Sequence, residues 1–302
     1  MVRFLHNSAV MSDKKITLIA GNRRLPFLFA DWARRSGWDL YIIGVKGEVD
    51  PSLKNEVSAD KYTELCVTEI SASVKFCKKN GVKEVVMIGG IAKAKFKLNL
   101  DVVKAAFKLL FVKNRHKGVF AVILSMFEKR GIKVCGIQEF MTDLVIGAGA
   151  LGKTEPKSDD LRAFSKNWSA VLDYIRTGHG QAVIIYNGEI LAFENFKGTD
   201  DLARRASAKR GEMGADSGGI MVKIMEPGQD ARADLPVVGT GTIETLAKYG
   251  FHGIIVEAGR TITDGTAETI ALADQNNIFV YGVNLTENNS YAPKSDLALS
   301  SS

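Results

Sequence analysis

The chain has 302 residues, of which 46% are hydrophobic and 25% charged, and its formal net charge is +6. This length is typical of two domains, and the composition is that of a soluble globular protein. No apolar run approaches the length of a membrane-spanning helix, and three widely spaced cysteines fit neither a zinc site nor a disulfide framework, which indicates a reducing compartment.

The two ends of the chain read differently from the rest. Residues 1–14 contain His and Asn and no apolar core, so we expect a disordered extension rather than a signal peptide, with either Met1 or Met11 as the start. The polar residues 286–302 are expected to form a disordered tail.

The first elements predict a strand, a turn, a helix and a second strand. Residues 15–20 are apolar, residues 25–35 are amphipathic with a proline suited to a first helical turn, and residues 38–45 are apolar again. This β-α-β order is typical of a nucleotide-binding domain. The turn reads Gly-Asn-Arg-Arg and not G-x-G-x-x-G, which makes it a poor dinucleotide fingerprint. A helix N-terminus after a strand can still hold phosphate through its free N–H groups, so Gly21 and Asn22 are candidate substrate-binding residues.

A pair of glycines follows a later strand of the same half. A helix is expected over residues 68–80 and a strand over residues 82–88, which runs into Gly89 and Gly90. Because glycine lets a ligand approach the backbone closely, both glycines are candidate substrate-binding residues.

The rest of this half alternates helix and strand. Helices are expected over residues 99–114 and 118–130, a strand over residues 132–137, and a short helix near residues 139–144. The pattern predicts an α/β domain over residues 15–146, with an open, mainly parallel, Rossmann-like sheet and helices on both faces.

A strongly basic segment lies inside this half. Residues 93–117 carry eight Lys or Arg against Asp101 alone, interleaved with large apolar side chains. Such a segment indicates a membrane-surface or nucleic-acid patch, or a solvated helix face over an ordinary core. No RNA- or DNA-binding motif supports the nucleic-acid alternative, so we expect no nucleic-acid partner.

Residues 147–157 are expected to link the two domains, because glycine and proline are dense there. Their Gly-Lys-Thr resembles the end of a P-loop. The upstream glycine is misplaced and no long apolar strand leads in, which excludes a Walker A site. Lys153 is instead a candidate substrate-binding residue that faces a cleft between the domains.

The second half, residues 158–285, predicts another α/β domain. A helix over residues 159–176 is followed by a hairpin with a type I′ turn at Asn187-Gly188. Thr199 and Asp200 are candidate substrate-binding residues, or alternatively only the cap and acidic first turn of a helix. The pattern then predicts alternating helices and strands. They are a helix over 200–210, a strand over 218–225, a helix over 242–249, a strand over 253–256, a helix over 266–275 and a strand over 278–283.

The segment from Met221 to Gly239 carries the polar groups with the clearest chemistry. Lys223 lies in an apolar, strand-like run, and Pro227-Gly228 is turn chemistry. Arg232 and Asp234 stand two residues apart, and extended backbone would place both on one side. Two cations and one carboxylate suit a bound phosphate and metal. The alternative is a surface ion pair beside a strand.

The chain resembles the UDP-2,3-diacylglucosamine pyrophosphatases of the two-domain type found in alphaproteobacteria, which act in lipid A biosynthesis. The resemblance extends from about Lys15 to Leu285 and rests on the order and spacing of short segments. These are Leu18 to Gly21, Leu25-Pro26, Leu151 to Lys153, Lys197 to Asp200, Lys223, Arg232 to Pro236 and Glu257 to Arg260.

The resemblance implies hydrolysis of the pyrophosphate of UDP-2,3-diacylglucosamine to 2,3-diacylglucosamine 1-phosphate and UMP. It also implies dependence on Mg²⁺, substrate held between the two domains, and an essential aspartate at Asp234, which is also the candidate metal ligand. Lys223 and Arg232 would supply cations to the substrate. The turn after the first strand departs from the family, since Arg23 and Arg24 replace small residues. The loop after the third main strand also departs, since it reads Gly89-Gly90 where Gly-Asn is common.

The acyl chains of such a substrate imply an enzyme at the cytoplasmic face of the inner membrane, which gives the basic residues 93–117 a role. A homodimer is left open.

Two other functional classes also stay open at this point. One is a nucleotide-sugar-binding protein without catalysis, against which Lys223 and Asp234 argue. The other is a nicotinamide-dependent oxidoreductase, which the missing glycine fingerprint disfavours.

Overall fold

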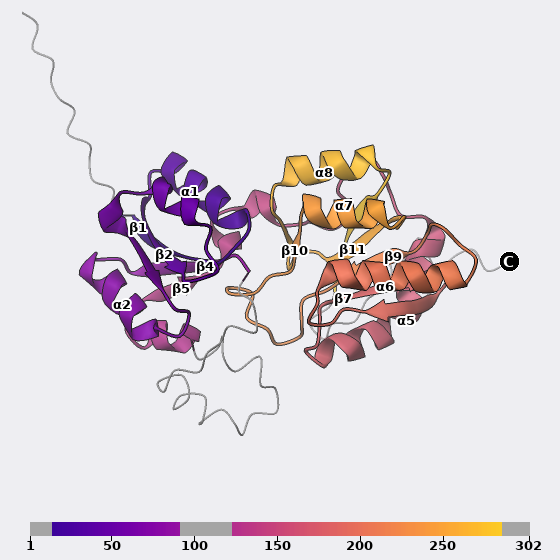
Figure 1. Ribbon diagram of the computed structural model, residues 1–302, viewed down its shortest axis with the longest axis horizontal. Coiled ribbons are helices and arrows are strands. Elements are labelled where there is room, and N and C mark those ends of the chain that lie inside the picture. Colours follow the sequence, from indigo (N-terminus) through magenta and orange to yellow (C-terminus); the bar gives the residue numbers. More distant parts are fainter. Residues whose placement is uncertain (1–13, 91–122, 286–302) are drawn as a thin grey trace, which may run out of the picture. The chain divides into compact units, whose positions relative to one another are not determined.

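The computed structural model describes residues 14–90 and 123–285. The chain divides into two compact units, whose described parts are residues 14–90 with 123–137 (unit 1) and residues 138–285 (unit 2) (Figure 1). Residues 91–122 lie outside the described residues, and with them the basic residues 93–117 and the helix predicted over residues 99–114. Residues 1–13 of the predicted N-terminal extension and the whole predicted tail, residues 286–302, also lie outside them. The domain boundaries and the substrate cleft between the domains stay predictions.

Unit 1 is built on a sheet of five parallel strands. They are β1 (Lys15–Ala20), β2 (Asp39–Val45), β3 (Tyr62–Leu65), β4 (Glu84–Ile88) and β5 (Lys133–Cys135), in the order β3-β2-β1-β4-β5. The chain moves from β1 out to β3 on one side and then returns to β4 on the other. The winding therefore reverses between β1 and β4, as in doubly wound nucleotide-binding folds. The predicted parallel, Rossmann-like sheet is confirmed.

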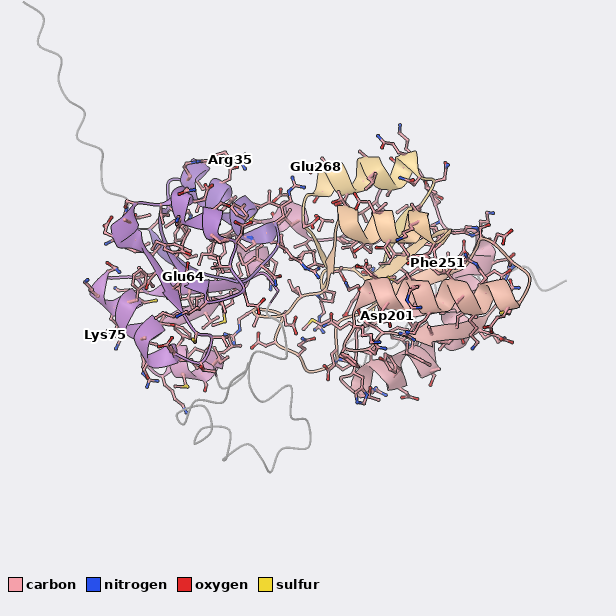
Figure 2. The ribbon with its side chains drawn as sticks, in the orientation of Figure 1. Arg35, Glu64, Lys75, Asp201, Phe251 and Glu268 are labelled. Carbon is pink, nitrogen blue, oxygen red and sulfur yellow. The ribbon has the colours of Figure 1, made fainter. Side chains whose placement is uncertain are left out.

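The described helices of unit 1 have simple local causes. They include α1 (Leu25–Arg35) and α2 (Ile70–Lys79), with short 3-10 helices η1 (Pro51–Glu56) and η2 (Ala59–Lys61). Residues 123–128, the described part of the helix predicted over residues 118–130, are also helical. Pro26 lies in the first turn of α1, and the basic residues that suit a helix C-terminus lie in the last turns of both helices, Arg35 among them (Figure 2). The strand predicted from residue 82 begins at Glu84, because the Val82 amide bonds to the Cys77 carbonyl and closes α2.

The segment after β5 contains less regular structure than the sequence predicts. The strand expected over residues 132–137 is only three residues long. The short helix expected near residues 139–144 is replaced by two 3-10 helices, η4 (Ile137–Glu139) and η5 (Thr142–Leu144).

Unit 2 contains a mixed six-stranded sheet in the order β6-β13-β11-β9-β7-β8. Its strands are β6 (Gly149–Ala150), β7 (Ala182–Tyr186), β8 (Glu189–Phe193), β9 (Ile220–Lys223), β11 (Gly253–Glu257) and β13 (Phe279–Val283). The three strands β9, β11 and β13 are parallel, and the outer ones pair antiparallel. A separate short pair joins β10 (Val237–Val238) to β12 (Ile262–Thr263). Residues Gly149–Ala150 of the expected linker are thus part of the sheet.

Helices cover both faces of this sheet. They are α5 (Ser158–Arg176), α6 (Thr199–Glu212), α7 (Thr240–Lys248) and α8 (Thr266–Gln275). Apolar side chains of α5, such as Phe164, pack on one face, and those of α6, α7 and α8, such as Leu202, Ile243 and Ala273, pack on the other. The type I′ hairpin turn is confirmed, because Asn187 and Gly188 have φ angles of 48° and 72°.

A buried arginine fastens the end of α6 to two loops. Arg210 is 1% exposed, and its guanidinium lies 4.8 Å from the centre of the Phe251 ring. The guanidinium donates hydrogen bonds to four backbone carbonyls, those of Ala215, Asp216, Gly218 and Tyr249. Because a buried cation needs such partners, these contacts fix both loops to the helix. We call this arrangement the Arg210 clasp.

Candidate functional site

The ends of β1 and β4 in unit 1 bring together four of the residues that the sequence singled out. The Gly21 amide donates to the Ile88 carbonyl at 2.8 Å, and Asn22 and Gly90 exchange backbone hydrogen bonds of 2.9 and 3.3 Å. Gly89 lies between them. The four residues therefore stand at the point where the winding of the sheet reverses, which is where ligands bind in open α/β sheets.

This region is assembled from backbone and leaves no room for side chains. A Cβ on Gly21 would lie 2.4 Å from the Gly90 carbonyl oxygen, and a Cβ on Gly89 would lie 2.6 Å from the Asn22 carbonyl oxygen. Gly89 also has a φ of 98°, which side chains rarely allow. Glycine is thus required at both strand ends, and we call Gly21, Asn22, Gly89 and Gly90 the glycine junction.

Two further residues, Glu48 and Arg23, lie next to the glycine junction. The Asn22 side-chain amide donates to Glu48 Oε2 at 2.9 Å, and the sequence had not singled out Glu48. Arg23 has a φ of 76° although it is not glycine. The departure of the Gly-Asn-Arg-Arg turn from the family pattern thus falls on a position that glycine would adopt more easily. The exposed Arg23 and Arg24 directly precede α1.

The edge of the unit 2 sheet at which β9 and β11 end holds the second group of candidates. Lys223 is the last residue of β9, and its Nζ donates to the Val237 carbonyl at 2.9 Å. Ala182, the first residue of β7, pairs with it. The partly buried ammonium group therefore lies at the carboxyl end of a parallel strand, the position that α/β sheets use for ligands.

The loop after β9 turns twice. The predicted turn at Pro227-Gly228 is confirmed, because Gly228 has a φ of 79° and the Gln229 amide bonds to the Glu226 carbonyl at 3.0 Å. A second turn follows, in which the amides of Ala233 and Asp234 both bond back to the Asp230 carbonyl, at 3.1 and 3.3 Å.

This second turn corrects the extended backbone considered from the sequence. Arg232 and Asp234 do not follow a period of two, because the chain between them is a turn. Arg232 instead pairs with Asp230, through Nε at 2.9 Å and a terminal nitrogen at 2.7 Å. These hydrogen bonds from Arg232 hold the pKa of the Asp230 carboxyl below its usual value.

A chain of hydrogen bonds connects Asp234 with Thr199. Gln229 Nε2 donates to Asp234 Oδ2, and Gln181 Nε2 donates to Gln229 Oε1 at 3.0 Å. The backbone N–H of Gln181 donates to Glu194 Oε2 at 2.8 Å, and Thr199 Oγ1 donates to Glu194 Oε1 at 2.9 Å. Three members of this chain, Gln181, Glu194 and Gln229, were not singled out by the sequence.

Thr199 is not the helix cap considered from the sequence. It is the first residue of α6, Gly198 takes the cap position with a φ of 84°, and the Thr199 hydroxyl is committed to Glu194. Asp200 accepts a hydrogen bond of 2.8 Å from Thr245 of α7. Both side chains therefore connect α6 to its neighbours.

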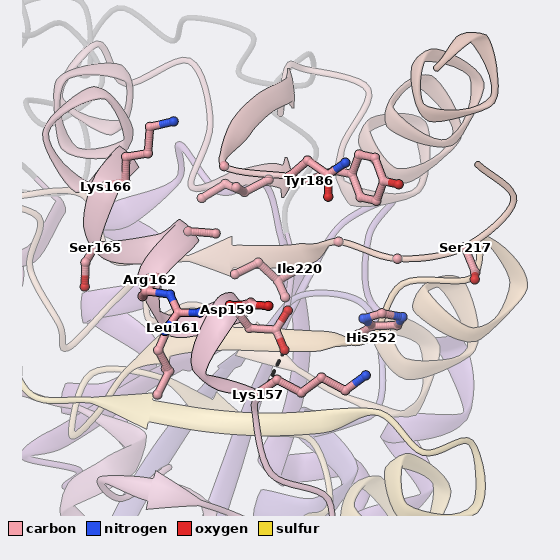
Figure 3. Close-up of a pocket in the computed structure, with 17 residues that line it drawn as sticks. Lys157, Asp159, Leu161, Arg162, Ser165, Lys166, Tyr186, Ser217, Ile220 and His252 are labelled. Atoms are coloured by element: carbon pink, nitrogen blue, oxygen red, sulfur yellow. Dashed lines mark hydrogen bonds and ion pairs between the residues drawn. The ribbon is translucent and has the colours of Figure 1, made fainter. Parts of the chain in front are cut away.

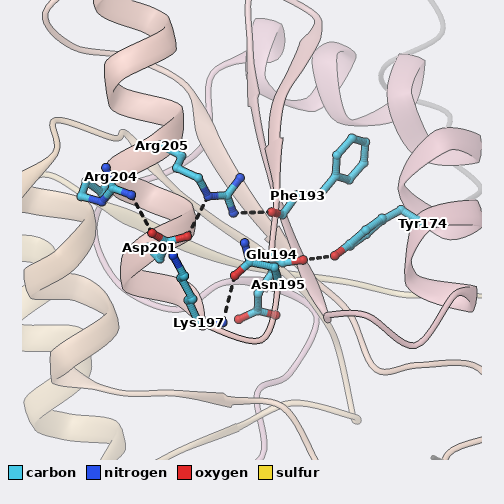
Figure 4. Close-up of polar contacts among 8 residues, drawn as sticks. All are labelled: Tyr174, Phe193, Glu194, Asn195, Lys197, Asp201, Arg204 and Arg205. Atoms are coloured by element: carbon cyan, nitrogen blue, oxygen red, sulfur yellow. Dashed lines mark hydrogen bonds and ion pairs between the residues drawn. The ribbon is translucent and has the colours of Figure 1, made fainter.

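Surrounding contacts hold the backbone of Glu194 in place (Figure 4). The Tyr174 hydroxyl donates to the Glu194 carbonyl, and an Arg205 terminal nitrogen donates to the Phe193 carbonyl at 2.6 Å. Arg204 and Arg205 both bond to Asp201, and these hydrogen bonds lower the pKa of the Asp201 carboxyl to about 2. The end of β8 is thus fixed by Arg205 of α6, whose orientation Asp201 holds.

Glu257 is a further acidic group at the same sheet edge. It is the last residue of β11 and is only 5% exposed. Burial raises the pKa of its carboxyl, although Arg260, whose Nε lies 3.6 Å away, and the Met225 amide act in the opposite direction. Its signal in the sequence was the Glu-Ala-Gly-Arg segment at a strand end.

Lys153 lies elsewhere in unit 2. Its backbone amide donates to Asp274 Oδ1 at 2.8 Å, and the preceding Leu151 pairs with Val280 near the start of β13. Lys223 lies where the parallel strands end. The structure therefore does not bring Lys153 to the edge that carries Lys223 and Asp234.

A cavity of about 1010 Å³ opens at the edge of the unit 2 sheet where β9 and β11 begin, opposite the edge that carries Lys223 (Figure 3). Its walls come from the start of α5, the Asn187-Gly188 turn, residues 217–220 and His252. None of the candidate residues named from the sequence lines it. We therefore place the candidate chemistry at the Lys223 edge, where charged groups converge, rather than in this cavity.

The described residues contain no cluster of three or more His, Cys, Asp or Glu that would hold a metal by themselves. Mg²⁺ is commonly held by one or two carboxylates together with substrate phosphates and waters. A donor set centred on the Asp234 carboxylate fits that mode. No helix among the described residues is long and apolar enough to cross a membrane.

Comparisons with known proteins match almost the whole chain. The family model of the LpxI N-terminal domain matches residues 15–144, and that of the LpxI C-terminal domain matches residues 147–281. A relative from Caulobacter vibrioides named UDP-2,3-diacylglucosamine pyrophosphatase LpxI is 30% identical over 91% of this chain and 99% of its own length. The crystal structure of Cj0485 dehydrogenase is 16% identical over 40% of this chain and 49% of that chain. Its TM-score of 0.24 is too low to indicate a shared fold.

Proposed function

Because the chain belongs to the LpxI family, we propose that it hydrolyses the pyrophosphate of UDP-2,3-diacylglucosamine. The products are 2,3-diacylglucosamine 1-phosphate and UMP, and the reaction serves lipid A biosynthesis. The observation that carries the proposal is the match to the Caulobacter pyrophosphatase along nearly its entire length.

Unit 2 supplies the charged groups for this reaction. A pyrophosphate resists water because its anionic oxygens repel the nucleophile, so cations must neutralise them. Lys223 is suited to this at the end of β9. Arg232 contributes a guanidinium whose orientation the Asp230 carboxylate fixes. Asp234, on the same loop, orients the attacking water or holds a metal.

Mg²⁺ is the metal that we propose for this reaction, with Asp234 as its protein ligand. When bound, Mg²⁺ neutralises phosphate oxygens and supplies a Lewis acid. Asp234 is held on one oxygen by Gln229, which fixes the direction in which the carboxylate faces.

The glycine junction of unit 1 is proposed to bind the nucleotide end of the substrate. The N-terminus of α1 is suited to a phosphate, because the first N–H groups of a helix lack intrahelical partners, and Gly21 and Gly89 bring the two strand ends together just before it. Lys153, Thr199 and Asp200 stay candidate substrate-binding residues. We further propose that substrate lies between the two domains.

The test is direct. Purified protein is incubated with UDP-2,3-diacylglucosamine and Mg²⁺, and UMP is measured by chromatography. We expect UMP release that stops in a metal-free control and returns when Mg²⁺ is restored. Substrate binding without UMP release would instead favour a nucleotide-sugar-binding protein without catalysis.

We also propose that the enzyme acts in the cytoplasm, at the inner-membrane surface, through the basic residues 93–117. Each cation near an anionic surface contributes about 1 kcal/mol to binding. We expect salt-sensitive binding to anionic vesicles that weakens when Lys104 and Lys108 are replaced by Glu. Unchanged vesicle binding in that variant would mean that the segment is a solvated face.

A further inference from the structure

The side chain of Gln229 is held at both ends of its amide. Nε2 donates to Asp234 Oδ2, and Oε1 accepts from Gln181 Nε2 at 3.0 Å. An ionised carboxylate only accepts hydrogen bonds, so Gln229 must present its amide nitrogen to Asp234, and its amide oxygen is then placed to accept from Gln181. All three side chains are partly buried.

Gln181 is itself fixed to the sheet on both sides. Its backbone amide donates to Glu194 Oε2 at 2.8 Å, and its carbonyl accepts from the Ile224 amide at 2.9 Å. It directly precedes β7, and Ile224 directly follows β9. The Gln229 amide is therefore anchored to the sheet and not only to its own loop.

The backbone of the loop that carries Asp234 is held by its own turns and by two distant donors. The Asp234 amide bonds to the Asp230 carbonyl, Gln138 Nε2 donates to the Ala231 carbonyl at 3.2 Å, and the Ile262 amide donates to the Pro236 carbonyl at 3.0 Å. These contacts fix the backbone, but a carboxylate rotates with little preference about its last torsion. A donor to the carboxylate itself restricts that rotation, and a group that orients water or metal must be held to within about 0.5 Å.

We infer that Gln229 is a positioning residue that holds the Asp234 carboxylate in its active orientation. Gln181 holds the oxygen end of the Gln229 amide, and Glu194 and Thr199 extend the same chain of hydrogen bonds to the start of α6. The inference rests on the proposed hydrolysis, and it adds a residue that acts through Asp234 without touching substrate.

The test compares two glutamines that contact the same loop. Gln229→Leu removes the amide at Asp234. Gln138→Leu is the matched control, because Gln138 Nε2 donates at 3.2 Å to the backbone carbonyl of Ala231 and not to Asp234. We expect Gln229→Leu to lower kcat by ~10–100-fold with little change in KM, as removal of outer-shell partners typically does. Gln138→Leu should change kcat far less, at a similar melting temperature.

A double-mutant cycle gives the second readout. If Gln229 acts through Asp234, then Gln229→Leu should lower kcat in the wild-type background and have no further effect in Asp234→Asn. Gln229→Met, which keeps a similar length and loses the donor without adding a charge, replaces Gln229→Leu if the latter does not fold. Losses that multiply across the cycle, or a loss equal to that of Gln138→Leu, would overturn the inference. Absence of UMP from the wild-type enzyme would instead overturn the proposed function, so the two failures are distinguishable.

Discussion

The glycine junction of unit 1 and the Lys223 edge of unit 2 lie at equivalent places in two α/β sheets, yet they are assembled differently. The junction consists of backbone groups brought so close that a Cβ at Gly21 or Gly89 would overlap a neighbouring carbonyl. The edge of unit 2 consists of side chains from several elements, joined by hydrogen bonds between Asp234, Gln229 and their partners.

This difference determines how each region responds to change. Backbone donors carry no titratable proton and cannot be removed singly by substitution. The stability of the junction should therefore depend little on pH and strongly on any added side-chain volume. The unit 2 edge can lose one functional atom while its shape persists, and its carboxylates respond to pH. Substitutions in unit 2 should therefore separate catalysis from stability, and substitutions in the junction should couple the two.

The largest effect is expected at Asp234. Asp234→Asn keeps the shape and removes the charge, so kcat should fall by ~10²–10⁴-fold, the range for loss of general-base help. Substrate binding should persist, because the uridine and acyl groups contact other residues. Turnover and thermal stability are measured on the same preparation, with Asp173→Asn on α5 as a control for loss of one surface carboxylate. Near-normal turnover with a lowered melting temperature would assign Asp234 a structural role.

The next effect is expected in the junction. Gly89→Ala meets both a φ of 98° and a carbonyl oxygen at 2.6 Å, whereas Gly37→Ala meets a φ of 71° and open space. Positive φ alone costs about 1–2 kcal/mol, and overpacking adds about 1–3 kcal/mol. Urea unfolding of both variants should show the larger loss for Gly89→Ala, together with weaker UMP binding. Equal losses would show that the close approach of backbone is dispensable.

A smaller, pH-dependent effect is expected at Glu257. Burial raises its pKa above the usual 4.5 in the folded protein, so the folded state holds this proton more tightly than the unfolded state. Ionisation therefore opposes folding, and the contribution to stability falls as pH rises through the raised pKa. Glu257→Gln should gain in melting temperature relative to wild type as pH rises above the usual pKa of 4.5. A constant difference would contradict the role of burial.

The smallest effect is expected at Asp201, and it has the opposite sign. Hydrogen bonds from Arg204 and Arg205 lower its pKa from 3.8 to about 2, so its contribution to stability is present above pH 3.8 and disappears as pH falls through about 2. The melting temperature of Asp201→Asn should lie below that of wild type at neutral pH, and the two should converge in acid. Failure to converge would place the effect outside this carboxylate.

Elements that depend on local sequence were predicted well. The apolar runs of β1, β2 and β4, the Asn187-Gly188 hairpin turn and the Pro227-Gly228 turn follow from periodicity and backbone preference. The resemblance to the pyrophosphatase family, which rests on ordered short segments, is confirmed by the family models.

What the sequence could not predict depends on contacts between distant residues. Gln181 and Gln229 are 48 residues apart, and neither carries a motif, so their pairing follows only from the antiparallel addition of β7 to β9. The local error at Arg232 has another cause. Two residues of separation predict a shared side only for extended chain, and the hydrogen bonds to the Asp230 carbonyl form a turn instead.

The Arg210 clasp has a consequence for measurement. Its guanidinium protons are covered by protein and bonded to carbonyls of two loops, so they can exchange with deuterium only when α6 separates from those loops. Because such openings in a core element approach global unfolding, the exchange rate of these protons reports the opening free energy of unit 2 without any chemical label. A single arginine side-chain resonance would then follow the integrity of unit 2 in native buffer.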